Sequence, residues 1–533
     1  MLNEGKRKMV NIKLFKSSRG QKIDKANAKN KAGGSAYQFS PKHQLAQLAA
    51  TGSLNDTFYA NGEDQLDHVL QLAKELDAEF IAKTAIYARH DGYMKDMPAL
   101  LAAVLATKDT ALLDQVFGRI IDNGKMLRNF VQIIRSGVVG RKSLGNRPKK
   151  LVQQWLLNAN EKQLLHAAVG NTPSLADVVK MVHPKAQETW RSAWFAWLIG
   201  RDYDMDALPP VTRAFEQFKQ ALREGTALPE MPEVPFQMLT ALNLNTAQWA
   251  TIARNGSWQM VRQNLNTFAR HGVFEIKGMA ELIAAKLRNA NNIAKANVMP
   301  YQLMSAYTMT AEGVPFIVRE ALQEAMEMAV ANVPTMIGNV VVCPDVSGSM
   351  HSPVTGYRQG ATSAVRCIDV AALMAAAVLR KNPQAKVLPF AETVRKIHLN
   401  PRDSIMTNAT LLAKTPGGGT NVSAPLAQLN AEKAKVDLVI LVSDNESWLD
   451  KKRRGATATM YEWEELKARC PQAKLVCIDI QPYASTQAYE RQDIMNIGGF
   501  SDVVFDVMTR FASGKSDGSH WVNVIERVSL QTQ

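Results

Sequence analysis

The stretch VVCPDVSGSM, residues 341–350, decides the fold class of the second half of the chain. An apolar, β-branched run ends in one carboxylate and two hydroxyls, Asp345, Ser347 and Ser349. Similar apolar runs follow at 386–390, 436–442 and 474–480, and helical patterns such as 461–469 alternate with them. Continuous apolar strands separated by helices predict an α/β doubly wound domain, a parallel sheet covered on both faces, over residues 336–533.

Two further polar clusters fall where strands of this sheet are expected to end. Thr420 follows three glycines, and Asp444 follows the apolar run at 436–442. Ligands of doubly wound sheets bind beyond the carboxyl ends of the strands. Two carboxylates and three hydroxyls, all oxygen donors, suit a hard divalent cation such as Mg²⁺, with a position left open for an acidic ligand. A turn or a helix cap is the alternative, and it explains one of the three clusters.

The set Asp345-x-Ser347-x-Ser349, Thr420 and Asp444 resembles the metal-ion-dependent adhesion site of von Willebrand factor A domains. The resemblance implies that Ser347, Ser349 and Thr420 are direct ligands of the cation. It also implies that Asp345 and Asp444 act directly or through water.

The rest of the chain has a different texture. Residues 1–35 mix Lys, Asn, Ser and Gly and are predicted to form a mobile basic arm. Residues 36–335 carry apolar side chains at helical spacing, interrupted by frequent Gly, Pro and Asn breakers. This pattern predicts many short helices in antiparallel pairs, an α-solenoid.

The net charge of the 533-residue chain is +14, and two segments carry all of the excess. Residues 1–50 hold 11 Lys or Arg against 2 acidic residues, and residues 119–150 hold 9 against 1. Concentrated positive charge favours a polyanion as partner, and nucleic acid is the commonest in a cytoplasm. A solubilising tail and a solvated helix face are the alternative.

Several functional classes lack support in the sequence. The longest apolar runs, such as 371–379, are too short to cross a membrane, and no secretory signal is visible. Four cysteines without CxxC spacing fit a reducing cytoplasm. Gly514-Lys515-Ser516 lacks the earlier glycine of a P-loop, and neither HExxH nor GxSxG occurs. We therefore expect a protein that is not an enzyme.

The helical array followed by an A domain is similar to the TROVE-domain family of Ro ribonucleoproteins. Three segments carry this resemblance: GVVGRKSLGNRPKKLVQQWL (137–156), DVVKMVHPK (177–185) and MNIGGFSDVVFDVM (495–508). It implies a ring of HEAT-like repeats closed by the A domain. It also implies small noncoding Y-like RNA on an outer basic surface, single-stranded 3′ ends of misfolded RNA in a central hole, and a role in RNA quality control. The expected partners are an exoribonuclease or an RNA-repair enzyme.

The matching segments give the candidate RNA-binding residues Arg135, Arg141, Lys142, Lys149, Lys150 and His183. A sparser basic series is compatible with an inward-facing surface or with a solvated face: Arg254, Arg262, Arg270, Lys286, Arg288 and Lys295. A different class of function is also open, a protein-interaction module in which Mg²⁺ at the A domain captures an acidic partner. A chaperone-like ATPase cofactor is a third, less favoured alternative.

Overall fold

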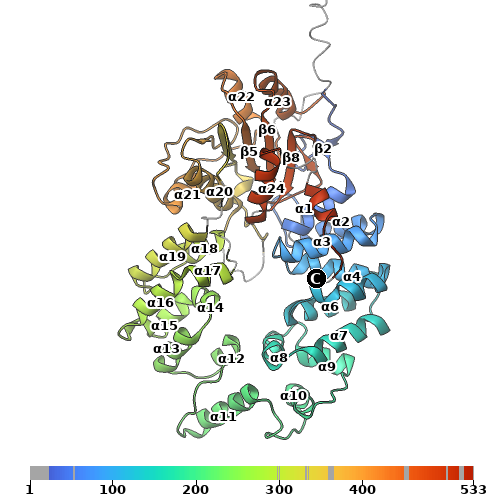
Figure 1. Cartoon of the computed structure of the whole chain (residues 1–533), viewed down its shortest axis with the longest axis vertical. Coiled ribbons are helices and arrows are strands. Elements are labelled where there is room, and N and C mark those ends of the chain that lie inside the picture. The colour runs from blue at the N-terminus through green and yellow to red at the C-terminus, as the bar shows by residue number, and fades with distance from the viewer. Residues whose placement is uncertain are drawn as a thin grey trace, which may run out of the picture.

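The computed structural model of the chain describes residues 23–51, 54–296, 298, 300–329, 333, 335–357, 365–448, 455–499, 502–514 and 521–531. A helical array fills the first part, and a five-stranded sheet with its covering helices fills the second (Figure 1). This arrangement confirms the predicted fold class, an α-solenoid joined to a doubly wound domain.

All pairings in the five-stranded sheet are parallel, in the order β4-β3-β5-β6-β8. The strands are β3 (Val340–Pro344), β4 (Lys386–Val387), β5 (Leu438–Ser443), β6 (Lys474–Asp479) and β8 (Ile494–Gly498). The covering helices are α20 (Cys367–Lys381), α21 (Ile405–Ala413), α22 (Ala424–Ala431), α23 (Ala458–Arg469) and α24 (Asp502–Ala512). The strand order places β3 and β5 side by side although β4 and the helices α20, α21 and α22 separate them in sequence, and such a reversal point is where ligands bind.

Side chains on the two faces of the sheet belong to two separate apolar clusters. Val340 and Val342 of β3 pack in a cluster with α20 and α24, and that cluster continues into the helical array. Val341 and Cys343 point the other way and pack with residues of α22 and α23. Because every second side chain of a strand faces the same side, a run that is apolar at every position must be covered twice.

The helical array stacks elements that are near neighbours in sequence. Its first half comprises α1 (Pro41–Thr51), α2 (Gly62–Glu75), α3 (Ala78–His90), α4 (Asp96–Lys108), α5 (Thr110–Ile120), α6 (Gly124–Ser136), α7 (Asn146–Asn158), α8 (Glu161–Ala168), α9 (Leu175–Val182) and α10 (Thr189–Ile199). Its second half comprises α11 (Pro210–Glu224), α12 (Phe236–Thr240), α13 (Thr246–Asn255), α14 (Trp258–Gln263), α15 (Leu265–Arg270), α16 (Met279–Leu287), α17 (Ala290–Ala296), α18 (Pro300–Thr308) and α19 (Phe316–Ala329). Helix α4 contacts α6, α5 contacts α7, and α7 contacts α9. This succession is typical of a solenoid.

The sheet domain covers both ends of the array. Helix α1 contacts β8, and α25 (Trp521–Glu526), which follows the sheet, packs on α1 and α3. At the other end, α18 contacts α20 and α19 contacts α21. Figure 1 shows the array leaving the sheet domain at α1 and returning to it at α18 and α19, so the two parts form a closed ring.

The described residues of the amino-terminal segment form part of the sheet domain. β1 (Ala28–Lys29) pairs with β2 (Ser35–Gln38), and β2 pairs with β7 (Ser485–Thr486), all antiparallel. The mobile arm predicted over residues 1–35 therefore does not hold for residues 23–35, because backbone pairing and the buried ring of Tyr37 fix this segment. Residues 1–22 lie outside the described residues.

Candidate nucleic-acid interface and metal site

The basic segment at 124–158 folds back on itself through the loop between α6 and α7. Gly137 ends α6 in the left-handed conformation, at φ 88°, a geometry that favours glycine. The loop then returns the chain so that α7 begins at Asn146, near the end of α6. The residues GVVG, 137–140, thus form a turn between helices.

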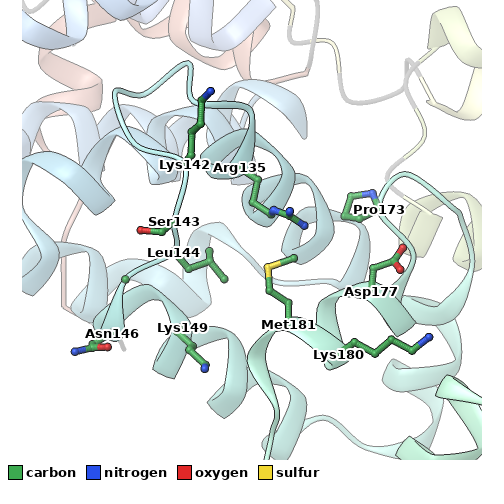
Figure 2. Close-up of a pocket in the computed structure, with 11 residues that line it drawn as sticks. Arg135, Lys142, Ser143, Leu144, Asn146, Lys149, Pro173, Asp177, Lys180 and Met181 are labelled. Carbon is green, nitrogen blue, oxygen red and sulfur yellow. The ribbon is translucent and has the colours of Figure 1, made fainter. Parts of the chain in front are cut away.

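A surface pocket of about 680 Å³ lies where α6, α7, their connecting loop and α9 meet. Its lining includes four cationic side chains, Arg135, Lys142, Lys149 and Lys180, and one carboxylate, Asp177. Figure 2 shows Arg135 and Met181 extending toward the middle of the pocket, with Asp177 on the far side from Lys149. No salt bridge within the described part of the chain neutralises any of the four cations.

The single carboxylate of the pocket, Asp177, takes part in the cap at the start of α9. The backbone N–H and the hydroxyl of Ser174 donate to Asp177 Oδ2 at 3.1 and 2.6 Å, and the Ser174 hydroxyl in turn accepts from the Asp177 N–H. These Ser174 hydrogen bonds, with Lys180 and Arg135 nearby, lower the pKa of Asp177. One capping anion among four cations leaves the pocket strongly positive.

The structure divides five of the six predicted RNA-binding residues into two groups. Arg135, Lys142 and Lys149 line the pocket, whereas Lys150 and His183 are exposed but do not. Lys149 and Lys150 are consecutive on a helix and point in different directions. His183 instead ends α9 in the left-handed conformation, at φ 51°.

Arg141 lies beside the pocket and holds the loop together. Its guanidinium donates to the carbonyl oxygens of Ser143, Leu144 and Ala106 at 2.8, 2.7 and 3.1 Å. It lies so close to Gly145 that a Cβ there would approach its Nη2 to 2.0 Å. The sequence predicted that the Arg141 guanidinium binds RNA, but three carbonyl oxygens already accept hydrogen bonds from it. The side chain therefore mainly fixes the shape of the loop.

Lys180 was not among the predicted residues, although its helix carried the signal. Helix α9 buries Leu175, Val178, Val179 and Val182 on one face. That spacing leaves Lys180 on the exposed side of the helix, near the pocket cations.

Side chains of the second basic series stabilise the helical array through contacts within it. Lys286 donates to the carbonyls of Ala253, Arg254 and Gly256, and Arg288 is paired with Glu320 and Glu324. Arg262 and Arg270 line a second pocket of about 770 Å³, which Val354 and Thr355 of the sheet domain also line. The Arg262 Nη1 donates to the Gln302 carbonyl at 2.7 Å. This pocket therefore spans the junction between the array and the sheet domain.

The predicted metal ligands meet at the adjoining ends of β3 and β5. Asp345 and Asp444 directly follow these strands, and Thr420 comes from the loop before α22. The backbone N–H of Gly348 donates to the Gly418 carbonyl at 2.9 Å, and the Trp448 N–H donates to the Thr420 carbonyl at 3.3 Å. These bonds tie the three ligand-bearing loops together. A Cβ on Gly417 would lie 2.8 Å from the Val346 carbonyl oxygen, so glycine permits this approach.

All five ligand side chains are buried, with at most 4% of their surface exposed. The Ser347 and Ser349 hydroxyl oxygens lie 3.3 Å apart. Asp345 accepts from the Ser347 N–H at 2.8 Å and from the Ser443 hydroxyl at 2.6 Å. Burial, and then the charge of Asp444, raise the pKa of Asp345 to about 7, and burial raises the pKa of Asp444 as well. Two carboxylates held together out of water are costly unless a cation or a proton neutralises them.

The donor set fits a hard divalent cation. It offers carboxylate and hydroxyl oxygens only, the ligand type that Mg²⁺ and Ca²⁺ take. Within the described residues, no three His, Cys, Asp or Glu side chains gather into a metal-binding group, so a cation here depends on the hydroxyls. The residues that can hold it are Asp345, Ser347, Ser349, Thr420 and Asp444.

The sheet domain and the chain as a whole are both similar to known proteins. Residues 339–512 match the model of the Ro60 vWA domain. The sheet domain is therefore similar to the Ro60 vWA domain. The chain as a whole is 24% identical over 529 residues to RNA-binding protein RO60 of Deinococcus radiodurans, with 93% of this chain and 97% of that protein covered. The crystal structure of the Deinococcus radiodurans RO (RSR) protein superimposes with a TM-score of 0.64 at 20% identity, covering 90% of this chain and 100% of the other.

These matches confirm the resemblance to Ro proteins that the sequence indicated, and they confirm the ring of helices closed by a vWA domain. The relative's name describes an RNA-binding protein. In the described part of the chain, no helix combines the length and the apolar character needed to cross a membrane.

We expect Arg141, but not its neighbour Lys142, to contribute to the stability of the fold. Arg141→Ala removes three hydrogen bonds to backbone carbonyls and should lower the free energy of unfolding by about 1–3 kcal/mol. Arg141→Lys should not restore it, because an ammonium lacks the planar fork that reaches three carbonyls. Lys142→Ala should change stability by less than about 0.5 kcal/mol. Urea unfolding followed by circular dichroism measures all three, and equal losses in Arg141→Ala and Lys142→Ala would contradict the assignment.

The carboxylate pair predicts a pH dependence of stability in the presence of a chelator. The pKa of Asp345 in the folded chain, about 7, lies above its ordinary value of 3.8. Its contribution is therefore fully present below pH 3.8 and is lost as the pH rises through 7, so the free energy of unfolding should fall over this window. The profile of wild type minus Asp345→Asn isolates this contribution in urea titrations between pH 4 and 8. A flat difference profile would show that burial and the charge of Asp444 do not raise the pKa of Asp345 as described.

Proposed function

We propose that this chain is an RNA-binding protein of the Ro type that takes part in RNA quality control in the cytoplasm and is not itself an enzyme. A small, structured Y-like RNA binds the basic pocket of α6, α7 and α9. Single-stranded 3′ ends of misfolded RNA bind inside the ring. An exoribonuclease or an RNA-repair enzyme acts on the RNA that the ring presents. The four unneutralised cations of the pocket carry this proposal, and the named function of the Deinococcus relative supports it.

The basic pocket has the chemistry of a phosphate site. Three ammonium groups and a guanidinium surround a surface depression, and each can donate to phosphate oxygens. Asn146 and Ser143 add neutral polar groups. Such a set binds a nucleic-acid backbone without reading its sequence, which suits recognition of an RNA by its shape.

The junction pocket suits a single strand. Arg262 and Arg270 provide positive charge, while Asn266, Ser305 and Thr310 provide neutral donors and acceptors. A ring selects unpaired ends by shape, because a single strand is thinner than a duplex. We propose that the junction pocket contributes to the single-strand site.

We also propose that Mg²⁺ or another hard divalent cation binds the five oxygens of the vWA domain. The buried pair of carboxylates supports this, since a cation removes their repulsion. The four described cysteines are all free thiols, which supports a reducing cytoplasm as the compartment.

The RNA proposal is tested by a triple variant, Lys142→Ala/Lys149→Ala/Lys180→Ala. The matched control is Lys396→Ala/Lys414→Ala/Lys435→Ala, which removes three exposed ammonium groups from the vWA domain. A hairpin RNA with a single-stranded 3′ tail is the probe in filter binding at several salt concentrations. Three lost phosphate contacts should weaken binding at least about tenfold and flatten the log–log salt slope by roughly 2–3.

The control triple should weaken binding much less, because its lysines lie away from the pocket. Equal losses in the two triples would reduce the interaction to net charge and would contradict the proposed site. An unchanged affinity in the pocket triple would place the RNA elsewhere on the chain.

A further inference from the structure

A loop of the helical array lies over the metal site of the vWA domain. This loop, residues 54–61 between α1 and α2, is called the roof loop. The Tyr357 N–H donates to the Asp56 carbonyl at 2.6 Å, and Asn55 Nδ2 donates to the Thr355 carbonyl at 2.9 Å. The Tyr483 hydroxyl donates to Thr57 Oγ1 at 3.2 Å, a bond that is buried. The roof loop is thus bound to two separate loops of the vWA domain.

Tyr59 of the roof loop reaches the metal site itself. Its hydroxyl is hydrogen-bonded to Ser349, one of the five predicted ligands, and its ring packs edge-to-face on Tyr483 with 5.8 Å between centroids. Burial and the charge of Asp444 raise the pKa of Tyr59 well above its usual value. The phenol therefore stays neutral and can both donate and accept at neutral pH.

The roof loop is a fixed extension of α2. The Thr57 N–H and hydroxyl donate to the Ala60 carbonyl at 2.7 and 3.0 Å. The carboxylate of Asp56 accepts from the Gly62 N–H at 2.8 Å, at the start of α2. Whatever fixes Tyr59 on the vWA domain therefore also fixes α2.

The amino-terminal segment holds the loop after Asp444. Asn30 Nδ2 donates to the Ser447 carbonyl at 2.6 Å, and the Ala32 N–H donates to Glu446 Oε2 at 3.0 Å. Gly34 approaches so closely that a Cβ would lie 2.1 Å from the Ser447 oxygen. Segments from outside the vWA sheet thus contact two of the three ligand-bearing loops.

We propose that Tyr59 occupies the side of the metal site that would otherwise accept an acidic partner, so that cation binding locks the helical array onto the vWA domain. This inference rests on the cation proposed for the five oxygens. It disfavours the protein-interaction alternative, because the chain supplies its own group where a partner's carboxylate would bind.

The coupling has a simple hydrogen-bond basis. A serine hydroxyl has one proton and two lone pairs. The Ser349 hydroxyl is also hydrogen-bonded to the Asp444 carboxylate, which competes with Tyr59 for its single proton. When the Ser349 and Asp444 oxygens ligate a cation, the Ser349 proton is directed away from Asp444 and is available to the Tyr59 oxygen. The bond between Ser349 and Tyr59 is then stronger with the cation than without it, and by linkage a closed roof loop raises cation affinity by the same factor.

The test compares full-length wild type, Tyr59→Phe and Tyr59→Ala, with Tyr203→Phe as the control that removes a phenol hydroxyl between α10 and α11. Mg²⁺ affinity is measured by isothermal titration calorimetry. Hydrogen exchange of the amides in 54–61 is followed by mass spectrometry with Mg²⁺ and with chelator. In wild type and in the control, Mg²⁺ should slow exchange of the roof loop at least about fivefold, the effect of one hydrogen bond.

Tyr59→Phe keeps the ring contact with Tyr483 and should lose both this protection and about fivefold in Mg²⁺ affinity. Tyr59→Ala should in addition gain Mg²⁺-dependent binding of acetate. Calorimetric Mg²⁺ binding without protection of residues 54–61 in wild type would overturn the coupling while leaving the cation proposal intact. Absence of Mg²⁺ binding in wild type would remove the cation and the coupling together, and RNA affinity reports on neither.

Discussion

A solenoid of helices has two terminal faces whose apolar side chains need a cover, and in this chain one domain covers both. Helix α1 packs on β8 at one end, and α18 and α19 pack on α20 and α21 at the other. Apolar contacts of the array and of one sheet face belong to a single continuous cluster. The position of every functional group depends on this closure, because it fixes the curvature of the array and the place of the vWA domain within the ring.

The two proposed sites use this frame in different ways. The basic pocket lies within the array, where Gly137 ends α6 and Arg141 ties the loop between α6 and α7 to the Ala106 carbonyl of α4. The metal site lies at the reversal point of the sheet, and the roof loop connects it to α2. One site presents charge that its surroundings leave unneutralised. The other gathers two buried carboxylates that repel each other, and we propose that a cation neutralises them and thereby strengthens the ring.

The sequence predicted the two domains and most strands of the sheet, but it did not predict the contacts between the helical array and the vWA domain. The apolar runs at 436–442 and 474–480 correspond closely to β5 and β6, because buried parallel strands are apolar at every position. β8 was missed, since Asn496 and Gly498 interrupt its run, and two-residue strands such as β7 carry no period at all. The five residues predicted as metal ligands share a motif, and the structure brings them together at the ends of β3 and β5. The roof loop has no such signal, because Thr57 and Tyr483 are hundreds of residues apart. Nor does a sequence show that the Arg141 guanidinium faces carbonyls rather than phosphates.

Lysine acylation of the full-length chain, with and without a 3′-tailed hairpin RNA and read by mass spectrometry, tests whether RNA lies on the pocket formed by α6, α7 and α9. RNA should protect Lys142, Lys149 and Lys180, while Lys396, Lys414 and Lys435 react as before. Equal reactivity of the pocket lysines in the two samples, or protection confined to the vWA domain, would contradict binding at this pocket.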